Sequence, residues 1–125
     1  MITRRPADRF RGSLLPSFRV SDFIEAVVTL LPSDAGGRLT AVLPRDGSYR
    51  PFARFRAGGP LLRVRFIEGP PMLSPGDSDR VVLELETFAG DDLLFSGVEL
   101  ELIEHATHVV GLVVVSRLWR GALAI

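Results

Sequence analysis

The sequence predicts an all-β domain, and three observations lead to this fold class. Apolar and polar residues alternate with a period of two in several short segments, whereas no useful length of chain has the spacing of an amphipathic helix. Nine prolines and twelve glycines punctuate these segments, as in a chain with many turns. A chain of 125 residues is long enough for one domain with a sizeable core. Six or seven strands joined mostly by short loops favour a β-barrel or a β-sandwich.

The first expected strand is "DFIEAVVTLL", residues 22–31. The next seven residues, "PSDAGGR", form a turn, because Pro and Asp initiate turns and Gly supplies a positive φ. "LTAVL" (39–43) is a short extended piece, and "PRDGSYRP" (44–51) is a second loop. "AGGP" and the Pro-Gly-Asp stretch of residues 68–79 separate the later segments. The later strands are expected at residues 52–56, 61–68, 80–88, 98–104 and 108–119.

Because successive side chains of a strand point to opposite faces, the alternation also assigns residues to the core and to the surface. The residues expected to point inward are Ala26, Val28, Leu30, Val64, Phe66, Val81, Leu83, Leu85 and Val113. The residues expected to point outward are Arg63, Arg65, Glu84 and Glu86. Trp119 either seals the barrel or, if it is exposed, marks a protein contact, since Trp is enriched at interfaces.

The net charge is zero, but the charges are unevenly distributed. Residues 1–65 hold twelve arginines and five acids, whereas residues 66–104 hold one arginine and ten acids. Such asymmetry can mark a nucleic-acid surface. The alternative is that arginine strands lie beside glutamate strands, because facing opposite charges stabilise an antiparallel sheet by about 0.2–1 kcal/mol per pair.

Composition excludes several kinds of site. The chain has no cysteine, so a disulfide framework, a thiolate nucleophile and a thiolate metal site are excluded. We expect a cytoplasmic protein, because no apolar stretch follows the N-terminal arginines as it would in a secretory signal. We expect no membrane span, because the longest apolar run, residues 109–115, is far too short.

Four short motifs, in order along the chain, carry a resemblance to a known family. They are "FIEAVVTLLPSDAGGRLT" (23–40), "YRPFARF" (49–55), "MLSPGDSDRVVLELE" (72–86) and "LIEHATHVVGLVVVSRLW" (102–119). Together they resemble the C-terminal, third domain of bacterial elongation factor Tu, with its Gly-Gly-Arg-x-Thr turn and its Met-Pro-Gly-Asp turn. The resemblance implies a six-stranded antiparallel closed β-barrel of that type.

In that family the barrel packs on a GTPase domain and contacts the T stem of aminoacyl-tRNA through two turns. The resemblance therefore implies an RNA- or partner-binding site at Gly36, Gly37, Arg38, Thr40 and Glu104. Two glycines of the family's closing hairpin are replaced by His105 and Ala106, which removes the close backbone approach that glycine permits. No phosphate-binding Gly-rich loop ending in Gly-Lys-Ser/Thr is present, so we expect neither GTPase activity nor nucleotide binding.

Other chemistry has weaker support. His105 and His108 of "EHATH" are the only histidines and are the candidate metal ligands, although a tight hairpin lacks the helix on which a His-Glu metal motif converges. Surface turn residues explain them without a metal. The paired glutamates of residues 84–86 and 99–101 follow from strand periodicity, and no Gly-x-Ser-x-Gly nucleophile elbow is present. We therefore expect no enzyme, no cofactor and no metal.

The sequence suggests three segments: an arginine-bearing arm (1–20), a barrel domain (21–120) and a C-terminal tail (121–125). The leading hypothesis is a non-enzymatic binding module, a free-standing translation-factor-like barrel that docks to a protein partner. The alternative is an RNA-binding protein that retains part of a tRNA-binding surface, helped by the arm. The arrangement of the arginines separates the two, because a continuous arginine face favours RNA and interleaved Arg and Glu favour a protein partner. The arginines of the arm are Arg4, Arg5, Arg9, Arg11 and Arg19.

Overall fold

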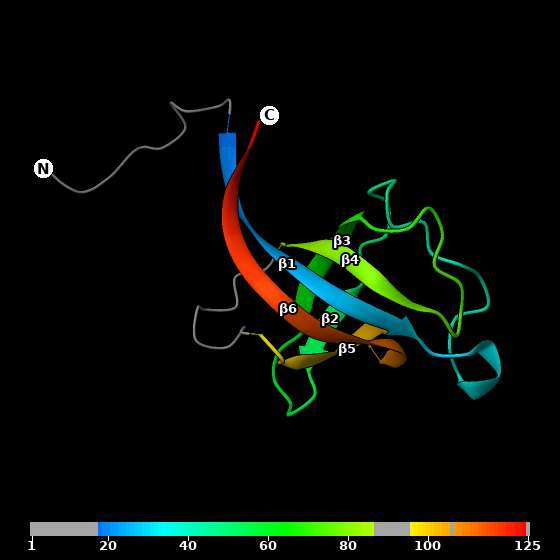
Figure 1. The fold of residues 1–125 in the computed structure, drawn as a ribbon. Coiled ribbons are helices and arrows are strands. Elements are labelled where there is room, and N and C mark those ends of the chain that lie inside the picture. Colours follow the sequence, from blue (N-terminus) through cyan, green and yellow to red (C-terminus); the bar gives the residue numbers. More distant parts are fainter. Residues whose placement is uncertain (1–17, 87–95, 106, 125) are drawn as a thin grey trace, which may run out of the picture.

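A computed structural model describes residues 18–86, 96–105 and 107–124, and the side chains of those between Asp22 and Trp119. The described chain forms a closed antiparallel β-barrel with the strand order β1-β4-β3-β2-β5-β6 (Figure 1). Closure of the sheet on itself pairs both strand edges around the barrel. The expectation of an all-β, six-stranded closed barrel is therefore confirmed. The strands are β1 (Phe18–Leu30), β2 (Phe52–Phe55), β3 (Leu62–Glu68), β4 (Ser78–Leu85), β5 (Glu99–Glu104) and β6 (His108–Ala124).

The first and last strands extend further than the sequence pattern predicted. β1 begins at Phe18, inside the segment expected to be an arm, and β6 continues to Ala124, inside the expected tail. The reason is that the two ends pair with each other, in register from Phe18↔Ala124 inward. A partner about one hundred residues away leaves no local signal, so periodicity alone missed it. Residues 1–17, which hold the remaining part of the expected arm, lie outside the described residues.

Two other segments differ from expectation. Residues 39–43 form no strand, and only Val42 pairs, in an isolated bridge with Leu73. The turn after β1 contains a short 3-10 helix, η1 (Ser33–Ala35). In the described part of the chain, no helix is long and apolar enough to cross a membrane.

A β-bulge in β6 keeps both halves of this long strand facing the core. Ala26 of β1 pairs with Val115, but Glu25 pairs with Arg117, so Ser116 has no partner in this ladder. The extra residue shifts the alternation by one position, as bulges do. Val115 before the bulge is buried, and Leu118 after it packs against the core. Without the bulge, residues with this odd spacing would point to opposite faces of the strand.

The core matches the sequence-based assignment. All nine residues expected to point inward are at most 7% exposed. Arg63 is exposed, and Arg65 and Glu86 keep part of their side chains at the surface, so their outward placement is also confirmed. The period of two was sufficient here because one face of each strand meets the core.

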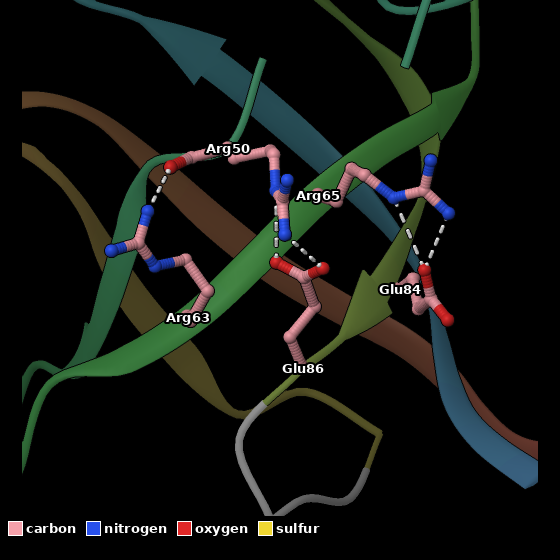
Figure 2. A network of polar contacts seen from close by, with 5 residues as sticks. All are labelled: Arg50, Arg63, Arg65, Glu84 and Glu86. Carbon is pink, nitrogen blue, oxygen red and sulfur yellow. Dashed lines mark hydrogen bonds and ion pairs between the residues drawn. The ribbon is translucent and has the colours of Figure 1, made fainter. Parts of the chain in front are cut away.

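Glu84 is the exception, because it was expected at the surface and is only 1% exposed. It lies on the outer face of β4, where its register neighbours are Arg65 of β3 and Phe23 of β1. Phe23 in turn stacks on Trp119 of β6, with 5.6 Å between the ring centroids. These large neighbours cover the carboxylate from both sides. Arg65 compensates the buried charge with Nε and Nη2 donating to the same carboxylate oxygen at 3.1 and 2.7 Å (Figure 2).

The uneven charge distribution is explained by pairing across strands. Figure 2 shows two of these pairs: Arg65 of β3 with Glu84 of β4, and Arg50, two residues before β2, with Glu86, which directly follows β4. The arginines come from the basic first half of the chain and the glutamates from the acidic stretch of residues 66–104. Interleaved pairing, the alternative to a nucleic-acid surface, is therefore observed. Among the described residues, five ion pairs join an arginine of residues 1–65 to a glutamate of residues 66–104: Arg38–Glu104, Arg50–Glu86, Arg54–Glu101, Arg56–Glu99 and Arg65–Glu84.

Because Glu84 is buried and the carboxylate of Glu99 is half exposed, the same substitution is expected to have unequal effects at the two positions. Glu84→Gln removes a buried, charge-assisted pair and is expected to cost about 1–3 kcal/mol of unfolding free energy. Glu99→Gln, the matched control in the Arg56 pair, is expected to cost less than about 1 kcal/mol. Urea unfolding followed by Trp119 fluorescence measures both. Equal losses for the two variants would contradict the burial of Glu84.

Candidate functional site

The candidate site lies at one end of the barrel, which we call the loop end. The strand ends place three connections there: residues 31–51 after β1, residues 69–77 before β4, and the β5–β6 hairpin around His105. The start of β1, the end of β6 and the β2–β3 turn lie at the opposite end. Figure 1 shows the first two connections on the side of the barrel away from the start of β1 and the end of β6. Residues far apart in sequence therefore meet at the loop end.

The turn after β1 is held by its two glycines. Gly36 ends η1 with φ of 88°, a left-handed conformation that suits glycine. Gly37 packs so tightly that an added Cβ would lie 2.1 Å from the carbonyl oxygen of Leu31. The hydroxyl of Ser33 donates to the carbonyl oxygen of Arg38 at 2.6 Å. These constraints fix the backbone from which the Arg38 side chain projects.

Arg38 joins this turn to the β5–β6 hairpin. Its Nη1 forms an ion pair with Oε2 of Glu104. Its Nε donates to the carbonyl oxygen of Thr40, and Nη2 donates to Thr40 Oγ1, both at 3.1 Å. The guanidinium also lies over the Tyr49 ring, 4.9 Å from its centroid. All three guanidinium nitrogens of Arg38 therefore have a partner, as suits a guanidinium that holds two segments together.

Tyr49 connects this network to the core. Its hydroxyl donates to Oε2 of Glu104 at 2.5 Å, and its ring packs against Phe66 of the core with 5.0 Å between centroids. Burial, and then the hydrogen bond to the Glu104 carboxylate, raise the pKa of the Tyr49 hydroxyl well above its usual range. Tyr49 therefore stays neutral and keeps donating to Glu104 at physiological pH.

The hairpin contributes a second link to the turn. His108 Nε2 lies 2.5 Å from the carbonyl oxygen of Gly36, and since a carbonyl only accepts, this nitrogen carries the proton. His105 has a positive φ of 54° at the hairpin tip, where the family resemblance has glycine. The two candidate metal ligands differ in their surroundings: His108 bonds to the Gly36 carbonyl, whereas His105 lies at the hairpin tip. Among the described residues no group of three or more His, Cys, Asp or Glu side chains is placed to hold a metal ion.

The structure thus brings together the residues that the resemblance assigned to one site. The network of Arg38, Thr40, Tyr49 and Glu104, with the His108–Gly36 contact beside it, is referred to below as the Arg38–Glu104 network. Tyr49 was not predicted as a site residue. It is the chain's only tyrosine, but its partner Glu104 is 55 residues away, so no local sequence pattern indicated the contact.

An open pocket of about 370 Å³ lies beside this network. It forms where the β2–β5 ladder ends: Phe52 pairs with Ile103, but the chain before it, residues 49–51, continues along β3 only. Two arginines and two aromatic rings give the pocket a mixed lining. The lining residues are Arg38, Tyr49, Arg50, Pro51, Phe52, Ile103, Glu104 and His105.

Three large apolar side chains are exposed at the same end. Leu39, which follows Arg38, is 88% exposed, and Leu43 and Met72 are 50% and 57% exposed. Leu43 and Met72 directly flank the bridge between Val42 and Leu73, whose side chains are buried. The bridge therefore anchors both exposed residues to the core.

Chemically, the loop end is a braced surface. Arg38 Nη1 and the Tyr49 hydroxyl both contact Oε2 of the Glu104 carboxylate. The bonds from Arg38 and His108 tie the turn after β1 to the hairpin. Comparison of the chain with models of known protein families and with curated proteins found no match.

The network predicts an unusual titration, which can be measured directly because Tyr49 is the only tyrosine. Ultraviolet absorbance during a pH titration is expected to show ionisation above the ordinary tyrosine value of 10.0. Glu104→Gln is expected to bring ionisation to a lower pH, because the charged acceptor is lost while burial remains. The raised pKa of Tyr49 also predicts how the stability depends on pH. The stabilisation that comes from keeping the Tyr49 hydroxyl neutral in the fold is fully present below pH 10 and is lost as the pH rises further. Ionisation of the native protein at the ordinary tyrosine value would contradict the network.

Proposed function

We propose that this chain is a non-enzymatic binding module that docks to a protein partner through the loop end of the barrel. The observation that carries the proposal is the exposure of Leu39, Leu43 and Met72 at the loop end, where the Arg38–Glu104 network also lies. Single exposed apolar residues are ordinary. Three exposed apolar residues on connecting loops at one end of a barrel indicate a partner-binding surface more strongly, because binding residues concentrate on loops held by a scaffold.

The bracing favours binding, because association costs free energy for each loop that must become ordered. Leu39 follows Arg38, whose backbone carbonyl is held by Ser33 and whose guanidinium is held by Thr40 and Glu104. The most exposed apolar side chain of the loop end therefore projects from a backbone that is already fixed. In this proposal the polar network serves to hold the docking surface in shape.

The arginines argue for a protein partner over RNA. RNA affinity depends on cations that can neutralise phosphates. Of the nine arginines whose side chains the structure describes, seven form ion pairs with glutamate. The other two, Arg45 and Arg63, donate to backbone carbonyls. Positive and negative groups thus alternate around the described wall, and binding a phosphate backbone would require several existing pairs to be broken.

We also propose that the barrel is of the elongation factor Tu third-domain type. Support comes from the agreement between the six-stranded closed barrel and the architecture that the resemblance implies. The Gly-Gly-Arg-x-Thr motif follows β1, and the Pro-Gly-Asp turn immediately precedes β4, in the expected order. In that family the barrel docks on another domain of its own chain, so docking to a protein surface is a natural role for a barrel of this type.

Specific RNA binding is not expected. Fluorescence anisotropy with labelled tRNA at near-physiological salt is expected to show no dissociation constant below about a micromolar, the strong end of non-specific binding. If tight binding were found, a steep salt dependence lost on Arg38→Ala, but kept on Arg63→Ala, would place the RNA at the loop end and overturn the proposal in favour of the RNA-binding alternative.

Docking is tested by capture from a lysate of the source cell, with and without RNase, followed by reconstitution with the purified captured protein. The double variant Leu39→Ser/Met72→Ser is expected to lose the complex, because it removes exposed apolar area without touching the core. Val114→Ser is the matched control, since Val114 is exposed on the barrel wall and away from the loop end. Equal binding by the double variant and the control would exclude the loop end as the docking surface, and loss of capture with RNase would point to RNA.

A further inference from the structure

The pocket beside the Arg38–Glu104 network has a binding chemistry of its own. It lies where the β2–β5 ladder stops, between residues 49–51 and the β5–β6 hairpin. Its volume of about 370 Å³ falls within the range of roughly 300–1,000 Å³ that is usual for ligand sites. All of its lining residues belong to the described chain. The pocket therefore has room for one large side chain of a partner.

Apolar groups form much of the lining. Pro51 and Ile103 line the pocket and are buried, whereas Phe52 and Tyr49 are half-buried. The Tyr49 ring also packs against Phe66 of the core, so its position is fixed from behind. Because covering the exposed parts of these rings removes apolar surface from water, the lining favours an occupant with an apolar body.

The polar groups of the lining leave an acceptor to spare. All three guanidinium nitrogens of Arg38 have partners in the Arg38–Glu104 network. Nε and Nη2 of Arg50 donate to Glu86 at 3.3 and 2.8 Å. Arg38 and Tyr49 both contact Oε2 of Glu104, and within the described chain no group bonds to Oε1. An occupant that complements this lining therefore supplies a hydrogen-bond donor.

The charges of the lining select among the possible donors. The guanidiniums of Arg38 and Arg50 both line the pocket, so a lysine or arginine side chain would meet like charge there. An aromatic ring is favoured instead, because cations are attracted to its face, most strongly to that of tryptophan. Of the neutral polar side chains, only tryptophan donates a hydrogen bond without also accepting one. Its indole therefore matches an apolar pocket that has a spare acceptor.

We propose that the pocket accepts a tryptophan side chain of the protein partner. The indole N–H donates to Oε1 of Glu104, and the ring lies against Phe52 and the guanidinium of Arg50. This inference rests on the proposed docking function and names the partner's anchor. Leu39 directly follows Arg38, which lines the pocket, so the pocket adjoins the proposed docking surface. Tryptophan is also enriched among the residues that contribute most of the affinity at protein interfaces.

The test uses the isotopically labelled full chain, with N-acetyl-tryptophanamide as the probe of the pocket. NMR is expected to show saturable shifts at the backbone amides of Arg50, Phe52, Ile103 and Glu104. The matched probe is N-acetyl-benzothienylalaninamide, in which sulfur replaces the indole N–H in a ring of similar size. It is expected to bind severalfold more weakly, because it offers Oε1 no donor. Absence of saturable shifts at the pocket, or equal affinity of the two probes, would overturn the proposal.

Two variants separate the pocket from the rest of the loop end. Glu104→Gln is expected to remove the preference for the indole, because Arg38 and Tyr49 hold the amide oxygen and an NH₂ group takes the place of Oε1. An undiminished preference in this variant would contradict the role of Oε1. Leu39→Ser/Met72→Ser is the control and is expected to leave the affinity for the probe unchanged, since neither residue lines the pocket.

The protein captured from the lysate tests the source of the tryptophan. Its binding to the labelled chain is expected to expel the probe, because the two compete for the pocket. A probe that binds the complex as tightly as the free chain would overturn the assignment to the partner. The docking function fails by a different result, namely a partner that keeps its affinity for Leu39→Ser/Met72→Ser, so the two failures are distinguishable.

Discussion

The pairing of β1 with β6 is the constraint on which the rest of the structure depends. These strands lie at opposite ends of the described chain, and their ladder turns a sheet with two open edges into a closed barrel. Closure in turn places the ends of β1 and β5 and the start of β6 together, which brings Arg38 within reach of Glu104. The bulge at Ser116 allows the long β6 strand to serve the core on both sides of the shift. The conformational entropy that the chain loses when β1 and β6 pair must be offset by the buried core that closure creates.

Electrostatics has two separate roles in this molecule. On the barrel wall, pairs such as Arg56 with Glu99 are exposed and contribute little stability, but they leave no continuous basic face on the part of the wall that the structure describes. In partly buried positions the pairing is structural: Arg65 compensates the covered Glu84, and Arg38 with Tyr49 occupies Glu104. The same arginine-rich composition therefore produces, in the described residues, a wall on which arginines pair with glutamates and a loop end held by polar contacts. This is why the charges favour a protein partner in our proposal.

The sequence by itself determined the fold class, nearly all the strands and the nine core residues, because alternation with a period of two is a local record of which face is buried. Family-like motifs also assigned Gly36, Arg38, Thr40 and Glu104 to one site, and the structure brings Arg38, Thr40 and Glu104 into one network, with Gly36 bonded to His108 beside it. Tertiary structure alone decided the rest. Glu84 is buried because large side chains flank it on neighbouring strands, and Tyr49 joins the network because Glu104 lies on a hairpin 55 residues away. The far ends of β1 and β6 are strands only because they meet each other. In each case the deciding partner is distant in the chain, so no local pattern could encode the contact.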